Sequence, residues 1–237
     1  MTEAGDPAFS PLAARRSARR QAVSIGLAVA PFGLAFGVAC TSAGLSVWQA
    51  LGFSSLVFTG ASQFAAVSVL SAKGAALAAI AAGVLLSLRS LAYGFVMAPA
   101  LRGPTWWRAL ASQLMIDEAM AVGTASDDLA VRRYGYLWGG CSVFVAWNLA
   151  TVAGAVLVSS GGEELIRRLG IDATIPAAFL ALIWPRLADP VQRAVAAAGA
   201  AIALVLIPLA PAGIPILAAS LAIGVAHLVD TEPAAER

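Results

Sequence analysis

Residues 85–93 read LLSLRSLAY, and they place Arg89 inside an apolar segment that runs from residue 75 to residue 98. The segment is long enough for a helix that crosses a bilayer, which takes about 20 apolar residues. An arginine at that depth costs about 2.5–3.5 kcal/mol on insertion scales, so it normally faces protein, a water-filled cavity or a counter-charge. The stretch therefore predicts a membrane-spanning helix whose one charge faces the protein interior.

Composition extends this reading to the whole chain. Of the 237 residues, 60% are apolar and 12% are charged, and the mean hydropathy is +0.84. A soluble domain carries about 25% charged residues. Because apolar segments recur along nearly the whole length, we predict an all-α, polytopic transmembrane helix bundle that forms one domain.

The expected boundaries are a polar, cytoplasmic N-terminal segment at 1–21, a transmembrane transport domain at 22–230 and a polar C-terminal tail at 231–237. Four arginines, at 15, 16, 19 and 20, precede the first apolar segment, and the positive-inside rule places them in the cytoplasm. A basic arm for nucleic acid is the alternative, which the neighbouring hydrophobic span disfavours. We expect no nucleic-acid partner.

Hydropathy predicts about seven or eight membrane helices, some of them short or interrupted. The expected spans are 22–43, 47–71, 75–99, 134–159, 191–209 and 212–229, with a less apolar segment at 105–126 and a short one at 174–187. Broken helices expose backbone groups in transporters. Candidate interruptions are APFG at 30–33 and TGAS at 59–62, for which a simple kink at Pro31 and close packing at Gly60 are the alternatives.

The arginine distribution conflicts with one of these spans. With the N-terminus inside, Lys73, Arg132 and Arg133 also fall inside, but Arg102 and Arg108 fall outside. Either the positive-inside rule is overridden here or segment 105–126 does not span fully.

A polar stripe marks the second predicted span. Ser55, Thr59 and Ser62 fall at i, i+4 and i+7, on one face of a continuous helix, with Gln63 beside them. Such groups can hold the ammonium or carboxylate of a small zwitterion. They can equally bond their own backbone or a neighbouring helix.

In the third span, small residues at 83, 87, 90 and 94 form a face suited to close helix contact, and Arg89 and Tyr93 flank it. Arg89 can bind a substrate carboxylate through two hydrogen bonds. The alternative is a structural ion pair with Asp117 or Glu118. Both roles are compatible if substrate competes for the guanidinium.

Asp117 and Glu118 lie in the largely apolar segment 105–126, where Gln113 is expected to share a face with Asp117. Adjacent helical residues point about 100° apart, so we expect at most one carboxylate to face the cavity centre. A carboxylate in low dielectric can carry a proton, which suits proton-coupled transport. The alternative is an interfacial segment with both acids hydrated.

These residues, in this order, resemble the AzlC family of branched-chain amino-acid permeases. The resemblance runs through PFGLAFG at 31–37, FTGASQF at 58–64, Leu88-Arg89 with Tyr93, Asp117-Glu118, and the prolines at 176 and 185. Ser87 and Ser90 depart from the family pattern, which usually has Asn and His there. Without that histidine, proton coupling would depend on Asp117 or Glu118.

The resemblance implies a multi-pass protein of the bacterial inner membrane that exports branched-chain or related amino acids. It also implies a small, AzlD-like membrane subunit as partner. Apolar walls at Phe36, Phe58 and Phe64 would favour leucine-like side chains.

We therefore predict a transporter subunit, not an enzyme, in contact with the lipid bilayer and an amino-acid substrate, with no cofactor and no metal. The predicted path residues are Thr59, Ser62, Gln63, Arg89, Tyr93, Asp117 and Glu118. A passive channel and a non-transporting assembly subunit are alternatives. A further alternative is an intramembrane hydrolase with Ser62 as nucleophile and His227 as base, which the surrounding motif does not support.

Overall fold

The computed structural model describes residues 10–168, 170, 177, 180, 183–211 and 213–229, and these residues contain helices but no β-strand. Three stretches are long and apolar enough to cross a membrane: α1 (Pro11–Ser42), α4 (Ala76–Ser87) with α5 (Arg89–Met97), and α8 (Leu129–Ser159). The prediction of an all-α membrane bundle is confirmed. The first helix begins at Pro11 rather than at the predicted residue 22, because Ser10 caps it.

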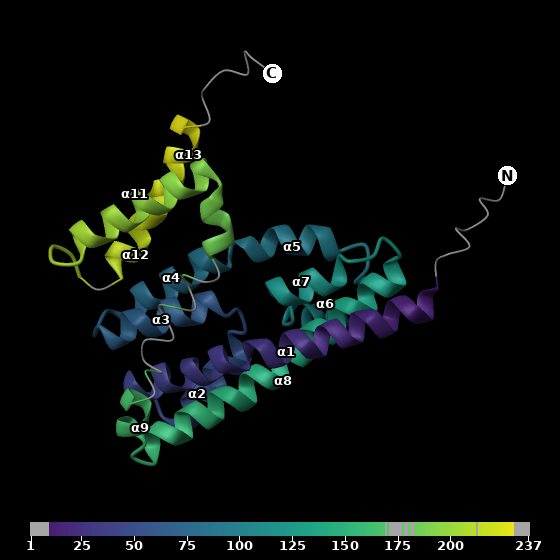
Figure 1. Ribbon diagram of the computed structural model, residues 1–237, viewed down its shortest axis with the longest axis horizontal. Helices are drawn as coiled ribbons and strands as arrows, with labels where there is room; N and C mark the ends of the chain where they lie inside the picture. The colour runs from purple at the N-terminus through teal and green to yellow at the C-terminus, as the bar shows by residue number, and fades with distance from the viewer. Residues whose placement is uncertain are drawn as a thin grey trace.

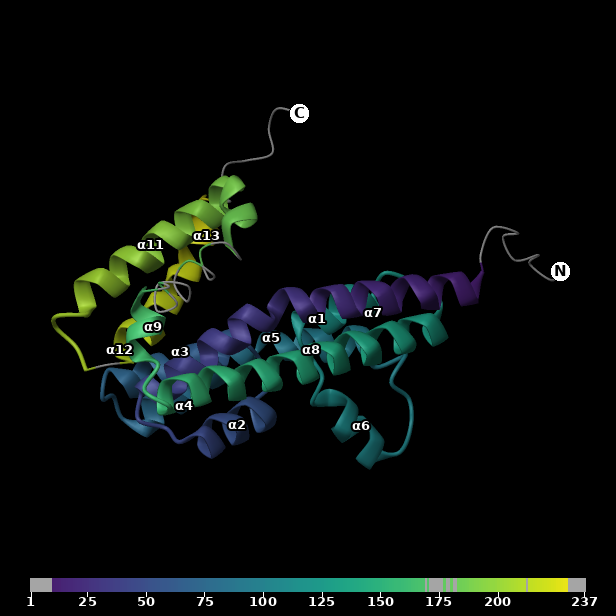
Figure 2. The same cartoon turned by 60° about the horizontal axis from the view of Figure 1, so that its bottom comes forward.

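Helices α1 and α8 pack side by side and parallel (Figure 1). A Cβ on Gly26 would meet Ser142, and one on Gly37 would overlap the carbonyl oxygen of Thr151. The absence of side chains at these glycines lets the two backbones approach closely, as small residues do in membrane helix pairs. We call this pair the frame, and Figure 2 shows it running the length of the molecule.

The interruption predicted at Pro31 is wrong. Helix α1 continues through Pro31 without a break. A proline removes one backbone donor and kinks a helix, but the tight packing of Gly33 and Gly37 against α8 keeps this one continuous.

The interruption predicted near Gly60 is confirmed. Segment 47–71 forms two short helices, α2 (Val47–Leu56) and α3 (Ala61–Ser71), joined by a tip at residues 57–60. Gly60 has a φ of +62°, a conformation that suits glycine. Because the helix is broken, the predicted single face of Ser55, Thr59 and Ser62 does not exist.

Segment 105–126 is likewise two short helices, α6 (Thr105–Ser112) and α7 (Asp117–Gly123), with a tip at residues 113–116. Helix α6 begins beside the start of α8, where Arg133 stacks on Trp107, and α7 returns to the same end, where Gly123 meets Tyr136. The segment therefore enters and leaves at one end, and the predicted shared face of Gln113 and Asp117 is wrong.

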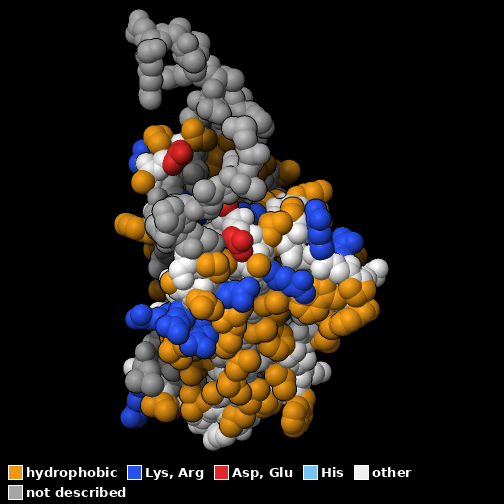
Figure 3. Space-filling model, turned by 90° about the vertical axis from the view of Figure 1, so that its right-hand side faces the viewer, with side chains coloured by type: hydrophobic (Ala, Val, Ile, Leu, Met, Phe, Trp, Pro, Cys, Tyr) orange, Lys and Arg blue, Asp and Glu red, His pale blue; other side chains and the backbone are white. Residues whose placement is uncertain are grey.

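This hairpin resolves the conflict over orientation. Together with the break in segment 47–71, it leaves Arg102 and Arg108 at the end where α1 and α8 begin, and Figure 3 shows the basic side chains gathered over that end. Lys73 lies in the turn between α3 and α4, at the opposite end, and not inside as the hydropathy count indicated. Of the two alternatives, incomplete spanning of 105–126 is the correct one.

The first hairpin enters from the opposite end. Helix α2 starts directly after α1 ends, and α3 runs antiparallel to α4, with Ser62 beside Ser87. Two half-helix hairpins thus enter from opposite ends and meet near the middle of the molecule.

The C-terminal part consists of short helices. They are α9 (Glu163–Arg168), η1 (Trp184–Ala188), α11 (Pro190–Leu206), α12 (Ile214–Ala219), η2 (Ser220–Ile223) and α13 (Gly224–Val229). Ile216 and Leu217 pack this part against α3 and α4. Half of the predicted segment 174–187, the whole tail 231–237 and the His227 side chain lie outside the described residues.

Candidate functional site

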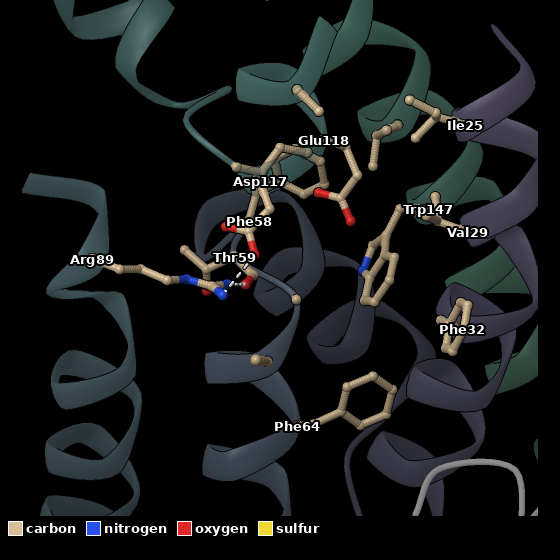
Figure 4. A pocket seen from close by; sticks show the side chains of 15 residues that line it. Ile25, Val29, Phe32, Phe58, Thr59, Phe64, Arg89, Asp117, Glu118 and Trp147 are labelled. Carbon is tan, nitrogen blue, oxygen red and sulfur yellow. Dashed lines mark hydrogen bonds and ion pairs between the residues drawn. The ribbon is translucent and has the colours of Figure 1, made fainter. Parts of the chain in front are cut away.

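A cavity of about 300 Å³ lies where the two hairpin tips meet the frame (Figure 4). Four of the predicted path residues line it: Thr59, Arg89, Asp117 and Glu118. They come from the first tip, the start of α5 and the start of α7, so segments far apart in sequence build one site.

Arg89 and Asp117 form an ion pair with 2.8 Å between Nη1 and Oδ2. The Nη2 of Arg89 also donates to the backbone carbonyl oxygen of Thr59, at 3.1 Å, and the hydroxyl of Tyr93 donates to the other oxygen of Asp117, at 2.7 Å. The arrangement follows from two helix breaks, because Leu88 separates α4 from α5 and Ile116 precedes α7. The predicted alternative of an Arg89–Asp117 pair is therefore what the structure has.

Glu118 also lines the cavity and points into it, toward the Trp147 side (Figure 4). Its carboxylate forms no ion pair within the described residues and accepts a hydrogen bond from its own backbone N–H. Both acids line the cavity, but Asp117 faces Arg89 at its edge and Glu118 alone faces its interior, in agreement with the expectation that at most one carboxylate faces the centre.

The indole nitrogen of Trp147 is buried and has no hydrogen-bond partner among the described residues. Burying an unpaired donor costs free energy, and because this nitrogen is covered, a guest could accept from it only after its neighbours shift. Sequence reasoning did not select Trp147, since a tryptophan in an apolar span usually packs in the core.

The remaining walls of the cavity are apolar. Phe32, Phe58 and Phe64 supply aromatic surface, and Ile25 and Val143 supply aliphatic surface. Of the three predicted wall residues, Phe58 and Phe64 line the cavity. Phe36 lies behind Phe64, with the ring centroids 5.4 Å apart.

Ser62 and Gln63 are fully buried but do not line this cavity. Ser62 accepts a hydrogen bond from Ser87, at 2.9 Å. The side-chain oxygen of Gln63 accepts from the backbone N–H of Gly60, at 3.0 Å, and its nitrogen lies 3.5 Å from the carbonyl oxygens of Phe53 and Ser54. These contacts hold the broken helix in shape, while contact with substrate stays a prediction.

The site offers one cation, two carboxylates and a buried N–H donor inside apolar walls. This combination can hold both charges of a small zwitterion together with an apolar side chain. Within the part of the chain that the structure describes, no three His, Cys, Asp or Glu side chains come together as a metal site. Ser62, the nucleophile of the hydrolase alternative, accepts a hydrogen bond from the hydroxyl of Ser87.

Fold and site together define a helical membrane protein with a charged central cavity. The family model described as AzlC protein matches residues 24–160, more than half of the chain, and the chain belongs to the AzlC family. This is a family of membrane transport proteins.

Two relatives agree with a membrane location. An uncharacterized membrane protein of Archaeoglobus fulgidus is 31% identical over 199 residues, which cover 84% of this chain and 87% of the relative. The inner membrane protein YgaZ of Escherichia coli is 25% identical over 175 residues, which cover 69% of each chain. No solved structure matches this chain.

Proposed function

We propose that this chain is the large subunit of a proton-coupled exporter of branched-chain or related amino acids in the bacterial inner membrane. The observation that carries the proposal is the Arg89–Asp117 pair at the edge of an otherwise apolar cavity, with Glu118 left unpaired inside it. Membership of a transport family and the resemblance to its branched-chain permeases support the substrate class.

Each group has a role in this proposal. Arg89 and the Trp147 N–H bind the substrate carboxylate, and Glu118 binds the ammonium or exchanges it for a proton. Phe58 and Phe64 contact the substrate side chain. Tyr93 acts through Asp117, which it holds in place.

The cytoplasmic end is the one where α1 begins, because the arginines gather there. The cavity lining reaches toward that end through Ile25 and Ala121. An amino acid would therefore enter from the cytoplasm, as export requires. A small AzlD-like membrane subunit is proposed as the partner, on the strength of the family resemblance.

The test is efflux of labelled leucine, valine, isoleucine and methionine from preloaded cells that express this chain with and without the small subunit. We expect efflux above background when both are present. Efflux that stays at background both with and without the small subunit, in cells where membrane insertion is confirmed, would exclude this substrate class. Efflux indifferent to a proton gradient would favour the passive-channel alternative.

A further inference from the structure

The first hairpin tip is fastened by a side chain that belongs to the second hairpin. The side-chain nitrogen of Gln113 donates to the backbone carbonyl oxygens of Ser55, at 2.8 Å, and Leu56, at 3.2 Å. The last carbonyls of a helix have no partner within the helix. Gln113 satisfies two of them at the end of α2 and so ties the two hairpins together.

Arg89 provides a second link to the first hairpin, because it donates a hydrogen bond to the carbonyl oxygen of Thr59 in the residue 57–60 tip. A substrate carboxylate that draws away this donor would leave Thr59 free. Of these two links to the first hairpin, only the one from Gln113 to the end of α2 would then remain.

The cavity ends at a layer of aromatic rings. Phe53 and Phe64 of the first hairpin lie against Phe36 of the frame, with centroid distances of 5.6 and 5.4 Å. Phe64 also meets Trp147 at 6.1 Å. On α1, the cavity-lining residues stop at Phe32, before this layer, so the rings separate the cavity from the outer end.

Each of these three ring contacts joins the hairpin to the frame. The frame itself is closely packed through Gly33, Gly37 and Gly154, whose missing side chains leave no space between α1 and α8. The hairpin meets α8 through side chains alone: a 3.3 Å approach between the hydroxyls of Ser54 and Thr151, a 2.8 Å bond from Ser55 to Asn148, and the rings of Phe58 and Phe144 at 5.0 Å. Movement of the hairpin would separate the rings while the frame stays intact.

We propose that Gln113 is a positioning residue for transport: it holds the end of α2, directly before the residue 57–60 tip, and its release lets the first hairpin open the cavity to the outer end. This rests on the proposed function for the identity of the path, but not on the identity of the substrate. Gln113 acts through the tip and needs no contact with the transported molecule.

The test measures which side of the membrane reaches the cavity. Val29, which lines the cavity, is changed to cysteine in a background carrying Cys40→Ala and Cys141→Ala. A charged, membrane-impermeant methanethiosulfonate is applied to right-side-out and to inside-out vesicles. With Gln113 present, we expect labelling from the cytoplasmic side.

With Gln113→Ala, we expect the labelling rate from the outer side to rise about tenfold, as loss of one pair of closing hydrogen bonds would produce. Gln113→Glu keeps the size of the side chain but loses both N–H donors, so it should raise the outer-side labelling rate as Gln113→Ala does. The matched control is Gln49→Ala, since Gln49 also bonds backbone on α2 but bonds only Ser46 of its own segment.

Unchanged outer-side labelling in a Gln113 variant that remains monodisperse would overturn the proposal, and so would an equal rise with Gln49→Ala. The labelling uses no substrate, so it is independent of the efflux assay. Absence of amino-acid efflux would end the proposed function while this result still decides the role of Gln113.

Discussion

Arg89 and Asp117 lie 28 positions apart in the chain, and their side chains form an ion pair of 2.8 Å. The pair joins a break in a spanning helix to the start of α7, in a hairpin that enters from the end where α1 begins. Both side chains remain partly accessible, at 38% and 42%. A charge pair placed in this way can hold the protein together and still exchange partners with a charged substrate.

Glu118 is expected to couple efflux to protons. Glu118→Gln removes the charge and the exchangeable acid but leaves the Arg89–Asp117 pair in place. We expect leucine efflux to lose its response to an imposed proton gradient, measured in preloaded vesicles. Tyr93→Phe is the control, because it removes only a hydrogen bond to Asp117 and should keep the response. A variant Glu118→Gln that still follows the gradient would contradict this role.

Substitutions of Gln63 test whether its side chain supports the tip or contacts the substrate. Gln63→Glu, as the neutral acid in this buried site, keeps an acceptor for the Gly60 N–H and an O–H donor, whereas Gln63→Ala loses both and leaves a partly buried donor unpaired, at a cost of about 1–3 kcal/mol. We expect Gln63→Ala to lower thermal stability in detergent and Gln63→Glu to restore part of it. Equal stability of the two variants, with altered substrate affinity in both, would instead indicate direct contact with substrate.

The frame depends on Gly37. A Cβ there would overlap backbone atoms of Thr151 and Ala155, which cannot move without shifting α8. We expect Gly37→Ala to destabilise the protein by about 1–3 kcal/mol, measured as a lower unfolding temperature. Gly52→Ala is the matched control, because nothing lies within 4 Å of its Cβ position and the helix should gain slightly. Similar unfolding temperatures for both variants would argue against close packing at Gly37.

The hairpin at 105–126 leaves Arg108 and Asp127, which lie at its start and just after its end, at the same end of the molecule, opposite to Lys73. With a cysteine at each position in turn, an impermeant thiol reagent applied to intact cells should label Lys73→Cys but neither Arg108→Cys nor Asp127→Cys. A continuous span at 105–126 would place Arg108 and Asp127 on opposite sides, so that one of these two cysteines would be labelled and the other would not. That result would contradict the hairpin and the cytoplasmic placement of the arginines.

Much of the fold could be predicted from hydropathy, since apolar length alone marks α1, α4–α5 and α8. Apolar length could not reveal the half-helices. Two short helices that enter and leave at one end have the same apolar length as one spanning helix. Only the misplaced Arg102 and Arg108 indicated the second hairpin, through the positive-inside rule.

The charged residues of the site were predictable because an intramembrane charge needs a partner. Arg89, Asp117 and Glu118 meet at one cavity for that reason. The position of Ser62 and Gln63 depended on the break at residues 57–60, which turns their side chains away from the cavity toward backbone and Ser87. Trp147 could not be predicted, since its unpaired N–H is visible only once its neighbours are placed.

The measurement that tests the central claim most directly is leucine efflux from cells with matched membrane amounts of the parent chain, Arg89→Ala and Asp117→Ala, each with the small subunit. Each variant removes a charged group that the proposed path needs, and a hydrogen bond to a charged group is worth about 1.5–3 kcal/mol, so we expect efflux to fall roughly tenfold or more in both variants. Efflux at the parent rate in either variant would contradict a transport path through the Arg89–Asp117 pair.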